Sequence, residues 1–446
     1  MKYVTVWDFI LFPIYFLIIY TIGNAVKSRN IEENKAYEYY TKGLLVKILG
    51  GFIFCCIYCF YYDGGDTNAY WEGAGILNKL ISKNFSVYLD IMAGNLTKTN
   101  LYNFDSTTGF PDYWRDPQSF STIRFTSPLY LLTVKSYFAC TLLVSSLTYA
   151  GIWRLYLLFN REFPGLEKQF AISILYFPSL VFWGSGIMKD TFTLSAACWF
   201  TYSIYMIFIK NEKMIPNIFW LIATSYVMIV FKPYIFIALL PGTLVWVSFK
   251  RIQNIENPVF KMLAAPVIIT IFFITGTFVF GSLSSGFQQY SSVEGVLNKA
   301  VTSQQDLKQE YNKGNSFDIG AFDGTIGSAL SKFPLAVTAG LFRPFIFEAR
   351  NPVMLISGIE NTFMLIFTIT FLFSVGPIKV VKYVIKEPLL LFSLTFAVFF
   401  AFGIGLSTSN FGALVRYKIP CIPFYLSALF VMREYFTKQE NLVSEE

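Results

Sequence analysis

Apolar residues occur along this chain in blocks that are long enough for a helix to cross a bilayer. A spanning helix needs about 20 mainly apolar residues, within a range of about 17–25. About eleven blocks reach or approach that length, namely residues 4–22, 44–62, 127–150, 170–187, 191–209, 215–231, 234–249, 262–281, 355–376, 387–406 and 419–432. The pattern predicts an all-α fold, a polytopic transmembrane helix bundle formed by a single integral membrane domain over residues 1–446.

Two pairs of neighbouring blocks are separated by only a few residues that include a charge. Lys189-Asp190 lies between the fourth and fifth blocks, and Lys232-Pro233 lies between the sixth and seventh. A membrane tolerates broken helices where the backbone lines a cavity inside the protein. Both pairs are therefore candidates for half-helices or re-entrant segments.

The short connections between blocks are positively charged, which predicts how the chain is oriented. Their cations are Lys27, Arg29, Lys35, Lys42, Arg154, Arg161, Lys168, Lys210, Lys213, Lys250, Arg251, Lys261, Lys379, Lys382, Lys386, Arg433 and Lys438. The positive-inside rule places them in the cytoplasm, with the N-terminus outside and the C-terminus inside. The two long connections, residues 63–125 and 282–354, then lie outside. The second is expected to be partly helical, because apolar residues recur at helical spacing over 293–301.

The composition agrees with this class and removes several kinds of chemistry. Charged residues make up 14% of the 446 residues, against about 25% in soluble proteins. The chain has no histidine, which excludes a Ser-His-Asp triad, an imidazole base and histidine-bound zinc or haem. All six cysteines fall inside apolar blocks, so Cys56 and Cys59 are better interpreted as packing residues than as a redox pair. Nothing in the sequence predicts nucleic acid as a partner.

An acidic turn follows the second apolar block, at the end predicted to face outward. Asp63 and Asp66 flank Gly64-Gly65, and Glu72 follows them. Two carboxylates three residues apart can supply oxygen ligands to magnesium or manganese, or act as a general base and the group that orients it. A solvated turn, in which Asp66 caps a helix that begins near Ala69, is the alternative.

Further polar residues collect at the outward ends of other predicted helices. They are Lys189, Asp190, Lys232, Arg343, Glu348, Arg350, Asn410, Arg416 and Lys418. The surplus of cations suits a lipid phosphate or diphosphate, because an Arg side chain can donate two hydrogen bonds to one phosphate. Binding of ordinary anionic lipid headgroups is the alternative for these cations. For Lys189-Asp190 the alternative is an internal ion pair or a helix cap.

Several of these residues belong to motifs that resemble a known family. The turn Asp66-Thr67-Asn68-Ala69-Tyr70 resembles the first-loop acidic motif of the GT-C superfamily of membrane glycosyltransferases. Three further blocks look like those of bacterial proteins of surface-polysaccharide assembly, the O-antigen-type polymerases among them. These blocks are Pro178-Ser179 to Lys189-Asp190, Arg343-Pro344 to Asn351, and Asn410-Phe411-Gly412 to Arg416. The chain departs from the common GT-C layout in that its acidic turn follows the second predicted span and not the first.

The resemblance implies a donor, an acceptor and a location. The donor would be a saccharide linked to polyprenyl phosphate or diphosphate, the acceptor a glycan, and the site would open at the outer face of the bacterial inner membrane. The resemblance also implies that Asp66 is the catalytic carboxylate and Asp63 its helper. Arg416 and Arg343 would hold the lipid phosphate, with Lys232 and Lys189 as secondary ligands.

The expected function is therefore that of a membrane glycosyltransferase or polysaccharide polymerase in envelope glycan assembly. A carboxylate would take the proton of the acceptor hydroxyl, and cations would neutralise the leaving phosphate. A transporter or flippase of a lipid-linked saccharide is one alternative, because charges in membrane helices also mark transport pathways. A non-enzymatic component of an envelope assembly machine is the other.

Overall fold

A computed structural model describes residues 3–257, 292–308 and 316–445, together with residues 259, 260, 263, 264, 267 and 270. The predicted block 262–281 therefore lies largely outside the described residues. All regular structure in the described part is helical, and a single antiparallel bridge there joins Ser316 to Asn410. The predicted all-α class is confirmed.

The chain folds into two compact units. Unit 1 consists of Met1–Arg161, Ile174–Tyr202 and Phe219–Lys232. Unit 2 consists of Glu162–Ser173, Ser203–Ile218 and Pro233–Glu446.

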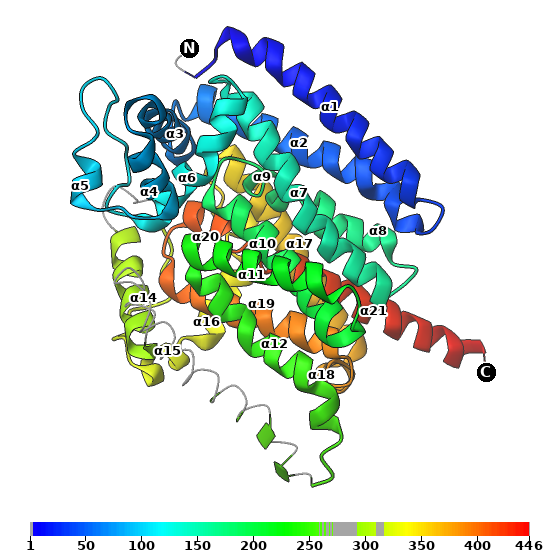
Figure 1. Cartoon of the computed structure of the whole chain (residues 1–446). Coiled ribbons are helices and arrows are strands. Elements are labelled where there is room, and N and C mark those ends of the chain that lie inside the picture. The colour runs from blue at the N-terminus through cyan, green and yellow to red at the C-terminus, as the bar shows by residue number, and fades with distance from the viewer. Residues whose placement is uncertain are drawn as a thin grey trace. The chain divides into compact units, whose positions relative to one another are not determined.

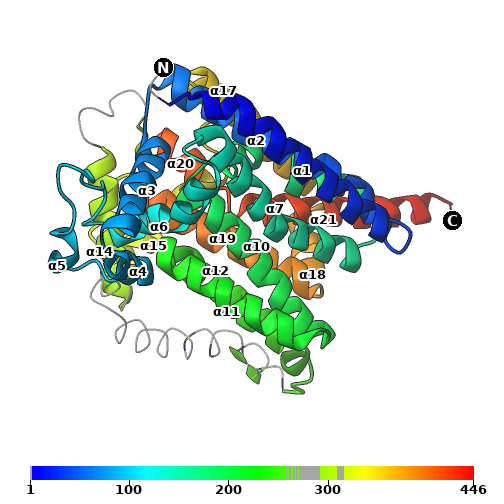
Figure 2. The same ribbon diagram turned by 45° about the horizontal axis from the view of Figure 1, so that its top comes forward.

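Unit 1 begins with two long helices that lie side by side (Figures 1 and 2). They are α1 (Val6–Asn30) and α2 (Tyr40–Cys56). A 3-10 turn (η1, Lys35–Tyr39) precedes α2, and a π-helical segment (η2, Ile57–Tyr61) extends it. Asp8 is one of the two buried residues of α1. Its Oδ1 accepts hydrogen bonds from Ser136 Oγ at 2.5 Å and Phe138 N at 3.1 Å. The carboxylate thereby caps the first turn of α7 (Tyr137–Glu162), where helix N–H groups lack partners of their own.

The predicted first outward loop is largely helical. It contains α3 (Asp66–Lys83), α4 (Phe85–Ala93), α5 (Lys98–Leu101) and the start of α6 (Pro117–Leu132). Figure 2 shows α3, α4 and α6 grouped together. A Cβ on Gly73 of α3 would lie 2.6 Å from the Ile123 side chain of α6, so the small residue permits this close packing. Arg124 of α6 donates to the carbonyl oxygen of Met92 near the end of α4, at 3.0 and 2.6 Å.

The chain is irregular between α7 and the next long helix. α8 (Glu167–Phe170), a π-helical segment (η3, Ala171–Tyr176) and α9 (Pro178–Trp183) precede α10 (Lys189–Ile204). The predicted block 170–187 is therefore broken twice, before Pro178 and again over residues 184–188. A further π-helical segment (η4, Tyr205–Lys210) leads to α11 (Met214–Phe231).

Unit 2 is organised around α19 (Pro388–Ser407). The helices packed on α19 are α12 (Pro233–Gln253), α14 (Val293–Leu307), α16 (Phe333–Phe342), α18 (Pro377–Val384), α20 (Phe411–Tyr417) and α21 (Ile422–Glu445). The remaining elements are α15 (Ile326–Ser331), a short 3-10 turn (η7, Ile346–Glu348) and α17 (Pro352–Val375). α14 confirms the predicted helix over 293–301. α16 lies in the predicted second outward loop, yet it packs closely on α19.

Seven described helices are long and apolar enough to cross a membrane. They are Val6–Asn30, Lys35–Tyr61, Tyr137–Glu162, Lys189–Lys210, Met214–Phe231, Pro352–Val375 and Pro388–Ser407. The helices Phe411–Tyr417 and Ile422–Leu442 together pass the same test but are bent by 65° at a short break, which would make an eighth span. A helical membrane protein is thus supported, whereas the predicted number of about eleven spans is not confirmed.

Candidate functional site

The acidic turn is held open by a backbone conformation that favours glycine. Asp63, Gly64 and Gly65 have φ angles of 51°, 134° and 143°. A Cβ on Gly65 would also lie 2.8 Å from the Tyr58 ring, so only glycine fits. α3 begins at Asp66 and its N-cap residue is Gly65. The alternative interpretation, with Asp66 as the N-cap of a helix starting near Ala69, was therefore wrong in its register.

Asp66 and Asp63 differ in their surroundings. Asp63 is exposed, whereas Asp66 is half-buried and its Oδ1 accepts a hydrogen bond from the Tyr113 hydroxyl at 2.8 Å. Glu72, also half-buried, lies six residues further along α3. At about 100° per residue it faces a different side of the helix from Asp66.

No group of three or more Asp, Glu or Cys side chains able to hold a metal occurs in the described part of the chain. If each carboxylate binds through one oxygen, Asp63 and Asp66 supply only two ligands to a metal. The magnesium or manganese site therefore stays a prediction.

Tyr113 reaches Asp66 from the loop between α5 and α6. Its φ angle is 60°, a region that costs energy for a residue with a bulky side chain. Its ring packs on that of Tyr70 with centroids 5.0 Å apart, and its carbonyl oxygen accepts a hydrogen bond from Asp116 N at 2.9 Å. The loop thus holds this tyrosine in a conformation that the isolated residue disfavours.

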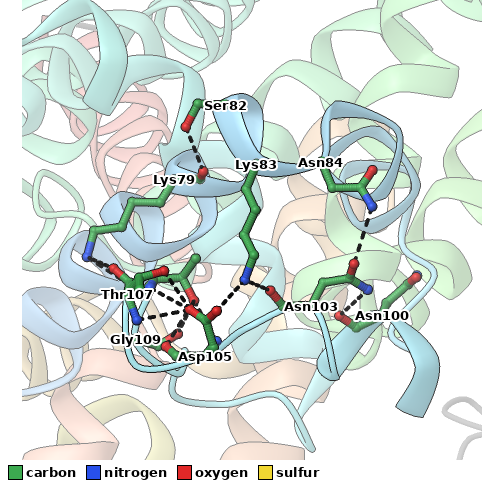
Figure 3. Close-up of polar contacts among 10 residues, drawn as sticks. Lys79, Ser82, Lys83, Asn84, Asn100, Asn103, Asp105, Thr107 and Gly109 are labelled. Carbon is green, nitrogen blue, oxygen red and sulfur yellow. Dashed lines mark hydrogen bonds and ion pairs between the residues drawn. The ribbon is translucent and has the colours of Figure 1, made fainter.

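A polar cluster fastens the same loop to α3, as Figure 3 shows. Lys79 donates to the carbonyl oxygens of Thr107 and Thr108, at 3.3 and 2.9 Å. Lys83 bonds to Asp105 Oδ2 at 2.7 Å and to the Asn103 carbonyl oxygen at 2.9 Å. The Lys83 ammonium and the Thr107 hydroxyl hold the pKa of the Asp105 carboxyl well below its usual range. These contacts come from one face of α3 and fix the path of the loop that ends at Tyr113.

Lys189 lies next to the end of that loop that leads into α6. Asp116 is the N-cap of α6, and its Oδ1 accepts from the backbone N–H groups of Gln118 and Ser119. The Lys189 ammonium donates to Ser119 Oγ at 2.8 Å and lies 4.0 Å from Asp116 Oδ2. The side chain of Lys189 is 19% exposed, so its charge is held in place without being fully withdrawn from solvent.

Five residues of unit 1 are therefore linked in a continuous series of contacts. We call them the Asp66–Lys189 site: Asp66, Tyr113, Asp116, Ser119 and Lys189. Two of its members, Asp66 and Lys189, are predicted site residues that the sequence separates by more than a hundred positions. The other three were missed. Asp116-Pro117 carries a usable signal, since Asp before Pro is typical of a helix start, whereas Tyr113 carries none.

Asp190 and Lys232 form an internal ion pair beside Lys189. Lys232 Nζ lies 2.5 Å from Asp190 Oδ1, and the two side chains are 6% and 1% exposed. Lys232 is thus buried against a carboxylate, which makes it a poor candidate for a phosphate ligand. An internal ion pair was one alternative to a phosphate-binding role for Lys189-Asp190. Asp190 does form such a pair, and its partner is Lys232.

The irregular segment before Lys189 is held by side chains from neighbouring helices. Lys47 of α2 donates to the Gly184 carbonyl oxygen, Ser145 of α7 to that of Ser185 at 2.6 Å, and Thr191 to that of Gly186 at 2.7 Å. Backbone carbonyls without helical partners need such donors inside a membrane protein. Lys47 was also missed, although a buried lysine within an apolar block is a signal in itself.

In unit 2 the predicted cations are engaged largely by internal partners. The Arg343 guanidinium is paired with Glu348, and it lies over the rings of Phe317 and Phe411, at 4.7 and 5.2 Å from their centroids. Lys418 is buried and donates to Leu341 O at 3.2 Å, Arg343 O at 2.9 Å and Asn361 Oδ1 at 2.6 Å. An ammonium has three N–H donors, so these acceptors satisfy it fully.

The remaining predicted residues of unit 2 have different roles. Asn410 is the N-cap of α20, with Oδ1 accepting from Ala413 N at 3.1 Å. Arg416 is half-buried and lies over the Tyr417 ring at 5.6 Å, and Arg350 is exposed. The predicted phosphate contacts of Arg416 and Arg350 stay a prediction.

Comparison with protein-family models, with curated proteins and with solved structures gave no match.

Proposed function

We propose that the protein is a membrane glycosyltransferase that uses a saccharide linked to polyprenyl phosphate or diphosphate and extends an envelope glycan. The observation that supports this proposal is the Asp66–Lys189 site. It combines a half-buried carboxylate, oriented by a tyrosine hydroxyl, with a fixed and partly exposed ammonium group. Asp66 follows closely on one candidate span, Lys35–Tyr61, and Lys189 begins another.

The chemistry proposed for the site requires one base and one counter-charge. The acceptor hydroxyl oxygen attacks the anomeric carbon of the donor sugar, and the bond between that carbon and the phosphate oxygen breaks. The proton of the hydroxyl passes to Asp66, and the lipid phosphate leaves with the electron pair. Lys189 neutralises the charge that develops on the phosphate, as preorganised cations do in other transfer reactions.

Substitutions at the two ends of the site test this proposal. We expect Asp66→Asn to reduce glycan elongation by at least about a hundredfold, since general-base catalysis typically contributes about 10²–10⁴-fold. Lys189→Gln should reduce it by about 10²–10³-fold, as removal of one preorganised charge-stabilising group does in other enzymes. Asp112→Asn is the matched control, because Asp112 is an exposed carboxylate of the same loop. Full elongation by both Asp66→Asn and Lys189→Gln at normal protein levels would refute the assignment.

A carrier for a lipid-linked saccharide is the second candidate function, favoured by the buried Lys232–Asp190 pair. Paired charges within membrane helices often mark transport pathways. Reconstitution in vesicles distinguishes the two candidates. A transferase forms a new glycosidic bond in detergent solution, whereas a carrier moves the lipid across a bilayer without forming that bond.

A further inference from the structure

A groove of about 300 Å³ lies between α17 and α21 in unit 2. Phe367, Phe371 and Phe436 supply apolar surface, and Thr370, Ser374 and Arg433 supply polar groups. The Arg433 guanidinium lies over the Phe367 ring, 5.4 Å from its centroid. The groove thus combines an aromatic wall with an exposed cation.

α18 borders this groove and carries more positive charge. Tyr383 of α18 packs on Phe436, with ring centroids 5.7 Å apart, and stacks on Tyr435 of α21 at 3.9 Å. Lys379 and Lys382 are exposed on α18, and Lys386 is exposed in the turn that follows. No ion pair joins these lysines or Arg433 to a carboxylate in the described part of the chain.

The position of α18 in the sequence places it at a membrane surface. It connects two candidate spans, α17 and α19, and both must end at the surface where their short connection lies. Ile378, Val381 and Ile385 are 71%, 55% and 56% exposed, beside the lysines. A short helix with exposed apolar residues next to exposed lysines is typical of the boundary between acyl chains and headgroups.

The carboxylates around this surface do not cancel its charge. Glu434 is paired with Lys438 at 3.2 Å, Glu440 lines the groove, and Glu387 is half-buried before α19. Four cations, Lys379, Lys382, Lys386 and Arg433, therefore face two carboxylates that have no lysine or arginine partner in the described residues.

We propose that the α17–α21 groove, with the lysines of α18, binds an anionic glycerophospholipid of the surrounding leaflet. An acyl chain packs on the three phenylalanines, and the phosphate takes charge-assisted hydrogen bonds from Arg433 and the lysines. The groove supplies the shape for one chain, and the charge selects an anionic headgroup over a zwitterionic one.

The test measures lipid binding to the full-length protein purified in detergent. Phosphatidylglycerol and phosphatidylcholine are titrated separately, with bound lipid counted by native mass spectrometry and the midpoint of thermal unfolding recorded. We expect phosphatidylglycerol to bind more tightly and to raise the midpoint. The triple variant K379Q/K382Q/R433Q should lose at least about tenfold in affinity for phosphatidylglycerol.

Two further variants separate this site from general surface charge. K27Q/R29Q/K35Q removes three cations near the connection between α1 and α2 and should leave the affinity unchanged. Thr370→Trp fills the groove from an exposed position without changing the charge, and it should weaken binding as well. Equal affinity for the two lipids, equal loss in both triple variants, or equal stabilisation by glycerol phosphate alone would overturn the proposal.

Discussion

Removing one partner of the buried Lys232–Asp190 pair is expected to destabilise the protein strongly. In Lys232→Met the carboxylate of Asp190, whose side chain is 1% exposed, loses a cation that lies 2.5 Å away. Breaking a buried ion pair in this way costs about 3–5 kcal/mol, because the remaining charge stays in a medium of low dielectric constant. Total stability is typically about 5–15 kcal/mol, so a loss of this size is a large fraction of it.

The assay is reversible unfolding in mixed micelles with an increasing fraction of denaturing detergent, followed by tryptophan fluorescence. Lys438→Met is the matched control, since it breaks an exposed pair with Glu434 whose side chains are 68% and 38% exposed. We expect this control to change the free energy of unfolding by less than about 1 kcal/mol. The double variant D190L/K232M should recover most of the stability lost in Lys232→Met, because neither buried charge remains.

A small effect of Lys232→Met, comparable with that of Lys438→Met, would refute this reasoning. It would show that Lys232 is not needed to neutralise Asp190, and it would restore Lys232 as a candidate phosphate ligand. Loss of donor affinity in the double variant D190L/K232M would likewise restore Lys232 as a candidate phosphate ligand.

Three other outcomes follow from the same geometry. Gly405→Ala should destabilise unit 2 by about 1–3 kcal/mol in the same unfolding assay, since its Cβ would lie 2.0 Å from Ala336 O, whereas Gly403→Ala meets nothing within 4 Å and serves as the control. The loop around Asp105 should loosen progressively as the pH falls below about 4, because the stabilisation from the lowered pKa of this carboxyl is complete above the pKa of an unperturbed Asp and is lost as the pH falls towards the lowered pKa. Hydrogen exchange over residues 103–109 measures this, and Asp105→Asn should remove the pH dependence. Tyr113→Phe should lower the rate of glycan elongation at unchanged protein levels, since it removes the hydrogen bond that orients the Asp66 carboxylate, and an unchanged rate would argue against Asp66 as the base.

Hydropathy sufficed to predict where most long helices lie, because crossing a bilayer requires a continuous apolar length that any sequence window detects. It failed for the block 170–187, where the average hides two breaks in the backbone. Those breaks depend on side chains distant in sequence, and Lys47 and Gly184 are 137 positions apart. A window of neighbouring residues carries no information about such a contact.

The sequence proposed Asp66 and Lys189 as site residues by residue type and by position at helix ends, but it placed Lys189 behind Arg416 and Arg343 among the cations. Arg343 and Lys418 have the same charge as Lys189, and only their surroundings separate them. Lys418 is satisfied by two carbonyl oxygens and Asn361, whereas Lys189 remains 19% exposed beside Ser119 and Asp116. Tyr113 has no sequence signal, because its role arises from a strained loop conformation.

The most direct test of the proposed transferase site is photolabelling of the purified protein with a photoreactive polyprenyl-phosphate analogue, followed by mapping of the labelled peptides. We predict labelling within residues 63–72, 113–119 and 184–190, and loss of that labelling in Lys189→Gln. Labelling confined to α17, α18 and α21, with none at these three segments, would contradict the account.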